Sequence, residues 1–283
     1  MKKVLIFTDL DGTLLDYRTY SFEKALPALQ LLRKRDIPLI ICSSKTAKEV
    51  ILYRERLENE HPFISENGGG IFIPKNYFKF EIRSASGGQE SIITEEGEYI
   101  VIRLGAAYSD LRKALEELRK EGFSVRGFGD MTVQEIADTA HLDMAEAELA
   151  KERDFDEPFI FKGTEEETRR LFEEITARGF YYTKGEFFHL LGDTDKGRAV
   201  SVLIDLYTKE FGEITTVALG DSQNDIPMLE LVDCPIIVQR LNKTYAISRN
   251  IPSLRRIEGI GSEGWNKAIF ELLLDSGNDE RQG

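Results

Sequence analysis

The sequence predicts a doubly wound α/β fold, with a parallel sheet between helices and an inserted α+β segment. Short apolar runs alternate with amphipathic helical patterns near both ends of the 283-residue chain. A stretch of different character interrupts this alternation, and the chain is longer than one hydrophobic core usually occupies. We therefore expect a discontinuous core of residues 1–83 and 190–283, with residues 84–189 inserted as a cap.

The N-terminal part of the expected core alternates strands with helices. Its predicted elements are strands at 4–8 and 37–42, a helix with Ala25, Leu29 and Leu32 on one stripe, a helix at 47–57, and a strand, glycine-rich turn and strand at 63–73. Such alternation forms right-handed crossovers and a parallel sheet, whose sites lie at the carboxyl ends of the strands. Asp9, Ser43 and Glu66 follow predicted strands, so we expect them at that edge.

The expected cap begins with small and polar residues at 84–98, which predict a linker. Its other predicted elements are a strand at 99–104, a helix capped by Ser109 and carrying Leu111, Ala114, Leu115 and Leu118, a strand at 158–162, a helix that starts at the capping box of Thr164 and Glu167, and two strands around Lys184 and Gly185. The first pattern then resumes, with helices at 197–207, near 226–231 and from Trp265 to Leu273, and strands at 215–220 and 235–238.

The composition is acidic, with a formal net charge of −13 from 37 Lys and Arg against 50 Asp and Glu. This charge repels a nucleic-acid backbone and an anionic membrane, so we expect a small-molecule partner that arrives with a cation. No run approaches the roughly 20 apolar residues that span a bilayer. The first apolar run ends in carboxylates rather than a cleavage site, and Cys42 and Cys234 lie in apolar runs as expected buried thiols. These features predict a cytoplasmic protein and leave the oligomeric state open.

Two carboxylates follow the first predicted strand in the string Asp9-Leu10-Asp11-Gly12. Residues i and i+2 of an extended segment share a side, so one carboxylate can attack phosphorus while the other protonates the leaving oxygen. Gly12 permits the sharp turn that follows. An acidic turn is the alternative interpretation, because Asp and Gly are common turn residues.

A second acidic cluster, from Gly220 to Asp225, follows the strand predicted at 215–220. Taken alone, it could also be a turn. Acidic clusters at the ends of two parallel strands repel each other unless a cation lies between them, and oxygen ligands suit Mg²⁺. The cation would also screen the approach of Asp9 to an anionic phosphate. Together, the two clusters predict a magnesium site.

Ser43 and Lys196 each lie at the start of a predicted helix. The Ser43 hydroxyl and nearby backbone N–H groups can bind phosphate, although N-capping by a serine is the alternative. A cation such as Lys196 is unfavourable at a helix N-terminus unless an anion is also bound, and a solvated surface lysine is the alternative. His189 lies among apolar residues, which favours a hydrogen-bonded core histidine over a metal ligand or base. No catalytic role is assigned to His61, His141 or His189.

The motifs DLDGT, SSK, DKG and GDSQND, in this order, resemble those of the haloacid dehalogenase superfamily of phosphohydrolases. Because the insert lies between the second and third motifs, the resemblance implies the superfamily core with the larger α+β cap class (C2 type), in which the cap chooses the substrate. It implies a Mg²⁺-dependent phosphoric monoester hydrolase. In the reaction it implies, Asp9 is the nucleophile, Asp11 is the general acid and then the base, and Ser43 and Lys196 bind the phosphate. The implied metal ligands are Asp9, Asp221 and the backbone carbonyl of Asp11, and Asn224 and Asp225 support that site.

Further strings, including ENGGGIFIP, GFGDMT, ERDFDEPF, FFHL and DKGRAV, resemble the family of mannosyl-3-phosphoglycerate phosphatases. This resemblance implies hydrolysis of mannosyl-3-phosphoglycerate, or its glucosyl analogue, in synthesis of a compatible solute. Glu186 departs from that family, because it stands where a basic residue is expected; Lys184, two residues away, could serve instead. The residues expected to bind the phosphorylated sugar conjugate are Ser43, Ser44, Lys45, Glu66, Asn67, Gly68, Arg126, Arg153, Lys184 and Asn224.

Three other functions fit parts of the same pattern. The first is a phosphatase of the same superfamily that acts on another sugar phosphate. A phosphosugar mutase would pass the aspartyl phosphate to a second sugar hydroxyl instead of water, and it would require a bisphosphate activator. A sugar-phosphate-binding sensor could keep the fold without catalysis. The intact set of Asp9, Asp11, Lys196 and Asp221 argues against the sensor.

Overall fold

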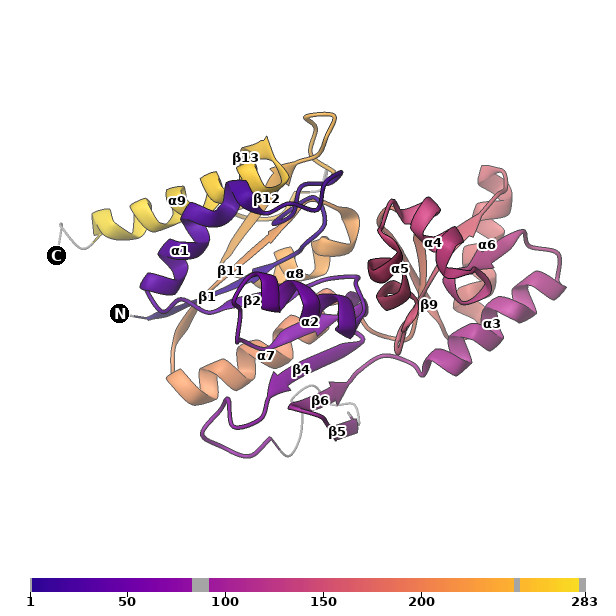
Figure 1. Ribbon diagram of the computed structural model, residues 1–283, viewed down its shortest axis with the longest axis horizontal. Coiled ribbons are helices and arrows are strands. Elements are labelled where there is room, and N and C mark those ends of the chain that lie inside the picture. The colour runs from indigo at the N-terminus through magenta and orange to yellow at the C-terminus, as the bar shows by residue number, and fades with distance from the viewer. Residues whose placement is uncertain (1, 83–91, 247–249, 280–283) are drawn as a thin grey trace. The chain divides into compact units, whose positions relative to one another are not determined.

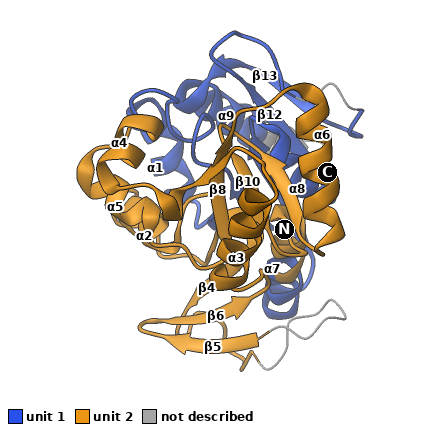
Figure 2. Cartoon of the chain, turned by 90° about the vertical axis from the view of Figure 1, so that its right-hand side faces the viewer, with its two compact units in different colours: residues 1–42, 203–283 blue, residues 43–202 orange. Residues whose placement is uncertain are grey.

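The computed structural model describes residues 2–82, 92–246 and 250–279. The chain forms two compact units (Figure 2): unit 1 contains Met1–Cys42 and Leu203–Gly283, and unit 2 contains Ser43–Val202. The first boundary falls directly after a strand, and the second falls within a helix. Unit 2 therefore contains residues 43–83 together with the segment expected as a cap, and the boundary of that cap stays a prediction.

The strands of unit 1 are parallel neighbours in the order β13-β12-β11-β1-β2. They are β1 Lys3–Thr8, β2 Leu39–Cys42, β11 Ile214–Gly220, β12 Cys234–Gln239 and β13 Arg255–Ile260. Thr8 at the end of β1 pairs with Leu219 near the end of β11, so the residues that follow these strands emerge at the same edge. The chain moves from β1 to β2 and later, in the opposite direction, from β11 to β12, which is the winding of a doubly wound sheet.

Helices flank these strands, with α1 and α9 together on one side (Figure 1). The helices of unit 1 are α1 Leu26–Lys34, α8 Ile226–Leu231, α9 Gly261–Asp279 and the last part of α7 Lys196–Phe211. The α8 crossover lies on the other face, because right-handed crossovers that run in opposite directions along a sheet place their helices on opposite sides. Trp265 in α9 is fully buried, and its indole Nε1–H donates to Thr8 Oγ1 at 3.0 Å. This bond fixes the end of β1 beside Asp9.

The first part of unit 2 contains one helix and an antiparallel set of strands in the order β3-β4-β6-β5. The elements are α2 Ala47–Arg56, β3 Phe63–Ser65, β4 Gly70–Pro74, β5 Ile92–Glu96 and β6 Tyr99–Arg103. The linker predicted at 84–98 is wrong at 92–96, because the β-branched Ile92, Ile93 and Thr94 pair with β6 as a strand. Residues 83–91 of that linker lie outside the described residues.

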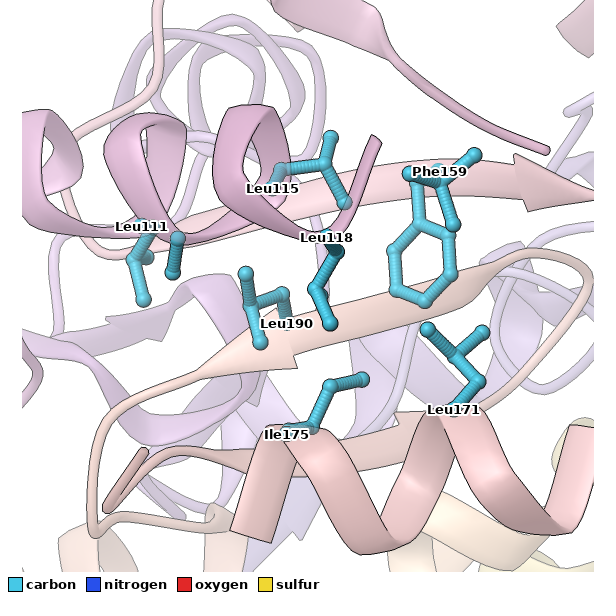
Figure 3. Packing of buried hydrophobic residues seen from close by; sticks show 9 residues of the cluster. Leu111, Leu115, Leu118, Phe159, Leu171, Ile175 and Leu190 are labelled. Atoms are coloured by element: carbon cyan, nitrogen blue, oxygen red, sulfur yellow. The ribbon is translucent and has the colours of Figure 1, made fainter. Parts of the chain in front are cut away.

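The rest of unit 2 is built around a second antiparallel sheet, in the order β7-β8-β10-β9. Its elements are α3 Tyr108–Lys120, β7 Val125–Gly127, α4 Val133–Ala140, α5 Met144–Lys151, β8 Asp156–Phe161, α6 Glu165–Ala177, β9 Tyr181–Lys184 and β10 Phe188–Leu191. One face of this sheet packs against α3 and α6 (Figure 3). The core on that face includes Leu111, Leu115, Leu118, Phe159, Leu171, Ile175 and Leu190.

Several elements differ from the prediction. Helices α4 and α5 were not predicted, because eight residues are too few for a clear periodicity, although a capping box of Thr132 and Glu135 marks the start of α4. Strand β13 was not predicted either, because Ile257 alone is buried along it. The N-cap assigned to Ser109 is wrong, since the extended Ala107 precedes a helix that already begins at Tyr108. No helix in the described part of the chain is long and apolar enough to cross a membrane.

Candidate active site

Two aspartates lie side by side at adjacent strand ends of unit 1. Asp9 follows β1 and Asp221 follows β11, which is its parallel neighbour. The backbone N–H of Asp9 donates to the Leu219 carbonyl at 2.9 Å, so main-chain pairing continues to the aspartate itself. Only 5% of Asp9 and 2% of Asp221 is exposed. The sheet therefore holds two carboxylates in a place with little water.

Asp225 completes a cluster of three buried carboxylates. Asp9, Asp221 and Asp225 each offer an oxygen, and these oxygens lie within 4.8 Å of one another. Arg240 Nε lies 3.7 Å from Asp221 Oδ2. Mg²⁺ prefers oxygen ligands and is commonly held by one or two carboxylates. The donor set, its spacing and its burial therefore fit this ion.

Asp225 also orients the loop that carries Asp221. Its Oδ2 accepts the backbone N–H of Asp221 at 3.0 Å and that of Ser222 at 2.9 Å. A Cβ at Gly220 would lie 2.6 Å from the Asp225 side chain, so this approach requires glycine. Asn224 Oδ1 accepts a hydrogen bond from the Ser222 hydroxyl at 2.5 Å, which places the Asn224 amide in the same loop. These contacts fit the predicted supporting role of Asp225.

The loop after Asp9 turns back tightly. The N–H groups of Thr13 and Leu15 both donate to the Leu10 carbonyl, at 3.1 and 2.8 Å. Gly12 has a φ of +79°, and a Cβ there would lie 3.0 Å from the Asp221 carboxylate, so glycine lets the two acidic loops approach. Asp11 is partly exposed in this loop. One of its carboxylate oxygens, Oδ1, is nevertheless buried.

In unit 2, Ser43 lies in the segment that leads into α2. Ser43 is fully buried, its N–H donates to the Ile64 carbonyl at 3.1 Å, and its Oγ accepts the N–H of Lys45 at 3.2 Å. The N-cap of α2 is Thr46, which forms a capping box with Glu49. The alternative interpretation of Ser43 as an N-cap is therefore wrong.

The loop of Glu66 and Asn67 is bonded to the Ser43 segment. The N–H of Asn67 donates to the Ser43 carbonyl at 3.0 Å, and the N–H of Glu66 donates to the Lys45 carbonyl at 2.9 Å. Both loop residues have positive φ, 48° for Glu66 and 55° for Asn67. Such strained backbone persists only where the surroundings determine it, so these bonds hold the two loops in one arrangement.

Gly68 brings the same loop against the start of α7. Thr194 Oγ1 donates to the Gly68 carbonyl at 2.9 Å, and a Cβ on Gly68 would lie 2.0 Å from the Asp195 carbonyl oxygen. Lys196, the first residue of α7, is fully buried. The alternative of a solvated surface lysine is therefore wrong. The role of Lys196 as a phosphate ligand stays a prediction.

We expect Gly68→Ala to lower both the melting temperature and kcat/KM. A Cβ in the left-handed region, here at a φ of +95°, costs about 1–2 kcal/mol, and the contact with Asp195 forces the backbone before Lys196 to move. A shift of about 1 Å at a positioning group can cost roughly 100-fold in rate. The matched control is Gly122→Ala, because Gly122 has a φ of +98° and nothing within 4 Å of its added Cβ. Equal effects of the two variants would contradict the steric argument.

The Glu66 carboxylate binds backbone N–H groups of the segment before β8. It accepts the N–H of Asp154 at 3.1 Å, of Phe155 at 2.8 Å and of Asp156 at 2.9 Å. Burial raises the pKa of Glu66 to about 8, although Arg153 and these N–H donors act against the rise. Glu66 therefore holds residues 154–156 against the loop after β3.

Arg153 belongs to the same buried network. Its side chain is 5% exposed, its Nη1 donates to the Ser44 carbonyl at 2.9 Å, and carboxylates of Asp156 and Glu49 lie 3.8 and 3.9 Å away. Burial alone would lower the pKa of Arg153, but the surrounding carboxylates, Asp156 first, raise it. Lys45 is also buried, and its Nζ lies 3.4 Å from Glu49 Oε1. Both cations therefore face internal carboxylates.

The structure does not bring Arg126 and Lys184 into this network. Arg126 is exposed on β7 and its Nη2 lies 2.5 Å from Glu135 Oε1. Lys184 is exposed at the end of β9, where its Nζ lies 4.6 Å from the ring centroid of Phe188. Phe188 packs on the face of the sheet that α3 and α6 cover, so Lys184 lies on that face as well. The substrate-binding roles of Arg126 and Lys184 stay predictions.

Asp156 and Thr194 were not singled out from the sequence, although Asp156 lies in a string that was and Thr194 lies beside one. Asp156 belongs to the string ERDFDEPF, and Thr194 precedes the DKG motif. The prediction of a hydrogen-bonded core histidine at 189 is confirmed. His189 is 5% exposed, and its Nδ1 lies 2.9 Å from Asp156 Oδ2.

The fold and the acidic cluster together define a class of hydrolase. A family model described as haloacid dehalogenase-like hydrolase matches residues 6–246, and the chain belongs to this family. This match confirms the resemblance to the haloacid dehalogenase superfamily and the predicted fold class. The assignment as a phosphoric monoester hydrolase is confirmed by curated relatives that are named phosphatases.

Two curated relatives are similar over nearly the whole chain. Identity is 46% to the glucosyl-3-phosphoglycerate/mannosyl-3-phosphoglycerate phosphatase of Methanococcoides burtonii, over 98% of this chain and 99% of that protein. It is also 46% to the phosphatase of the same name from Persephonella marina, over 95% and 97%. A solved haloalkanoate-superfamily phosphatase of Bacteroides thetaiotaomicron superposes with a TM-score of 0.64 at 20% identity, over 96% of this chain and 95% of that one. At that identity the likeness shows the fold alone.

Proposed function

We propose that this chain hydrolyses glucosyl-3-phosphoglycerate and mannosyl-3-phosphoglycerate to the glycosylglycerate and inorganic phosphate. The observation that carries the proposal is the buried cluster of Asp9, Asp221 and Asp225 after β1 and β11. It occurs in a chain that is 46% identical to phosphatases of these two substrates. The cluster supplies a nucleophile and metal ligands in one place.

Asp9 and Asp11 divide the chemistry between them. In the first step, a carboxylate oxygen of Asp9 attacks phosphorus, the ester P–O bond breaks, and Asp11 donates a proton to the leaving glycerate oxygen. This leaves an aspartyl phosphate on Asp9. In the second step, Asp11 takes a proton from water as the water oxygen attacks phosphorus. The P–O bond to Asp9 breaks, which releases phosphate and restores both carboxyl groups.

The phosphate is anionic, so it needs positive charge and donors around it. The Ser43 hydroxyl and the Lys196 ammonium would bind its non-bridging oxygens. Asp9, Asp221 and the backbone carbonyl of Asp11 would hold Mg²⁺, with Asp225 orienting the loop of Asp221. Bound there, the ion supplies positive charge that stabilises the transferring phosphoryl group.

The remaining parts of the proposal concern the cap, the binding partners and the location in the cell. Residues 84–189 would act as a cap that selects a small phosphorylated sugar conjugate. The net charge of −13 supports a reaction without nucleic acid or membrane as partner. Location in the cytoplasm stays a prediction.

We expect kcat/KM on glucosyl- or mannosyl-3-phosphoglycerate to exceed that on mannose 6-phosphate or sucrose 6-phosphate by at least about 100-fold. The phosphate is common to all four, so the gap must come from groups that bind the glycerate part, and buried polar groups left unpaired discriminate strongly. Phosphate release by the purified chain with Mg²⁺ measures it. Equal rates would indicate a phosphatase of another sugar, and a requirement for a bisphosphate activator would indicate a mutase.

A further inference from the structure

Arg240 follows strand β12 at the edge of unit 1 that carries the acidic cluster of Asp9, Asp221 and Asp225. Strand β12 is the parallel neighbour of β11, which is itself the parallel neighbour of β1. The residues that follow these three strands therefore leave the sheet at the same edge. Arg240 thus belongs to the same compact unit as the cluster, and strand order places it there.

A short turn fixes the backbone of Arg240. Its N–H donates to the Thr244 carbonyl at 3.0 Å, and its carbonyl accepts the N–H of Lys243 at 2.8 Å. Gln239, the residue before it, is bonded through both atoms of its side-chain amide: Nε2 donates to the Lys243 carbonyl at 3.2 Å, and Oε1 accepts the N–H of Gly259 at 3.0 Å. The Arg240 side chain therefore starts from a defined position.

The Arg240 guanidinium contacts Asp221 through one nitrogen and keeps other donors available. Its Nε lies 3.7 Å from Asp221 Oδ2. Neither Nη1 nor Nη2 donates a hydrogen bond within residues 2–82, 92–246 and 250–279. The side chain is 38% exposed, so a ligand can reach these nitrogens. Two parallel N–H groups of a guanidinium match the two oxygens of a carboxylate.

The length of the substrate suits this placement. In a 3-phosphoglycerate ester, four covalent bonds of about 1.5 Å each join phosphorus to the carboxylate carbon, so the two lie no more than about 6 Å apart. Asp221, which Arg240 contacts, offers an oxygen within 4.8 Å of one from Asp9. A phosphate that Asp9 attacks can therefore place the glycerate carboxylate within reach of the Arg240 side chain.

We propose that Arg240 binds the glycerate carboxylate of the substrate through its Nη groups and thereby sets the preference for phosphoglycerate esters. This inference rests on the function proposed above and names the group that reads its substrate. Without a cation beside it, a carboxylate so close to the acidic cluster would be repelled by like charge. A phosphorylated sugar that lacks the carboxylate offers the guanidinium no bidentate partner and gains nothing from it.

Other cations are placed less well for this task. In unit 2, Arg126 is paired with Glu135, and Arg153 is surrounded by internal carboxylates. In unit 1, Lys24 is paired with Glu263 of α9 rather than with the acidic cluster. Arg240 combines contact with a residue of the cluster and donors that a ligand can reach.

The test compares two substrates that differ at the carboxylate alone: glucosyl-3-phosphoglycerate and 2-glucosylglycerol 3-phosphate, in which a hydroxymethyl group replaces it. We expect Arg240→Ala to lower kcat/KM on the first by about 10- to 100-fold, mainly through KM, the range expected for loss of hydrogen bonds between charged groups. On the second, kcat/KM should change by less than about 3-fold, because no charged partner is lost. Arg240→Lys, which keeps the charge but not the fork, should lose less of this selectivity.

Arg256→Ala is the matched control, because Arg256 is exposed on β13 of the same unit and its side chain forms no hydrogen bond or ion pair with the residues that the structure describes. It removes the same charge and should leave the ratio between the two substrates unchanged. Mg²⁺ should raise the melting temperature of Arg240→Ala at least as much as that of the unaltered chain, since the substitution removes no predicted metal ligand.

The outcomes separate this inference from the proposed function. If the unaltered chain does not hydrolyse glucosyl-3-phosphoglycerate, the proposed function fails and the inference fails with it. If it does, and Arg240→Ala lowers kcat/KM on both substrates by one factor or loses the Mg²⁺-dependent rise in melting temperature, Arg240 acts on the phosphate or on Asp221. The carboxylate role alone is then overturned.

Discussion

Asp9→Asn is expected to lower kcat by at least about 10⁴-fold, because loss of a nucleophile removes the covalent step itself. The substitution hardly changes volume, and the backbone N–H of Asp9 remains bonded to the Leu219 carbonyl. It also removes one of three buried carboxylates whose oxygens lie within 4.8 Å of one another, which reduces their repulsion. The melting temperature without added metal should therefore stay the same or rise.

Single-turnover phosphate release and thermal melting together measure these effects. The matched control is Asp36→Asn, because Asp36 is exposed, has a φ of 51° that asparagine tolerates, and has its side chain paired with Lys3. That variant should keep full turnover. Normal turnover in Asp9→Asn would remove the aspartyl phosphate from the mechanism, whereas lost turnover with a large fall in melting temperature would indicate a structural role instead.

The carboxylates of unit 1 could be predicted because their signal is local. Asp9 and Asp221 each follow an apolar run, and adjacent parallel strands bring such ends together. The start of α6 at the capping box of Thr164 and Glu167 was predicted for the same reason, whereas the N-cap assigned to Ser109 was wrong. Where two interpretations were locally equal, the structure decided: Thr46 caps α2 in place of Ser43, and Lys196 is buried.

The network in unit 2 could not be predicted, because its partners are distant in sequence. Glu66 binds backbone N–H groups of residues 154–156, and Asp156 joins Asn67 to His189. None of these side chains belongs to a periodic pattern that distinguishes a buried polar partner from a surface charge. The apolar residues around His189 correctly indicated that this side chain is buried. They contained no information on which ring nitrogen would be hydrogen-bonded to another residue.

Removal of divalent ions with EDTA is expected to abolish phosphate release, and added Mg²⁺ is expected to restore it. Asp9, Asp221 and Asp225 are at most 5% exposed, and their oxygens lie within 4.8 Å of one another. Without a bound cation, an anionic nucleophile would have to approach an anionic phosphate in a site with little water to screen the repulsion.

The metal assignment also has a readout that does not depend on turnover. An ion that binds the folded state but not the unfolded state stabilises the folded chain, and above Kd this stabilisation grows with the logarithm of the ion concentration. Mg²⁺ should therefore raise the melting temperature of the unaltered chain. Asp221→Asn should lose most of this shift and most of the activity, since it removes a ligand, whereas Asp36→Asn should keep both. Undiminished phosphate release in excess EDTA, or an equal Mg²⁺-dependent shift in Asp221→Asn, would reject the site. A cluster that bound no ion would instead become more stable when Asp221 was neutralised, because the repulsion among its carboxylates would then be the dominant effect.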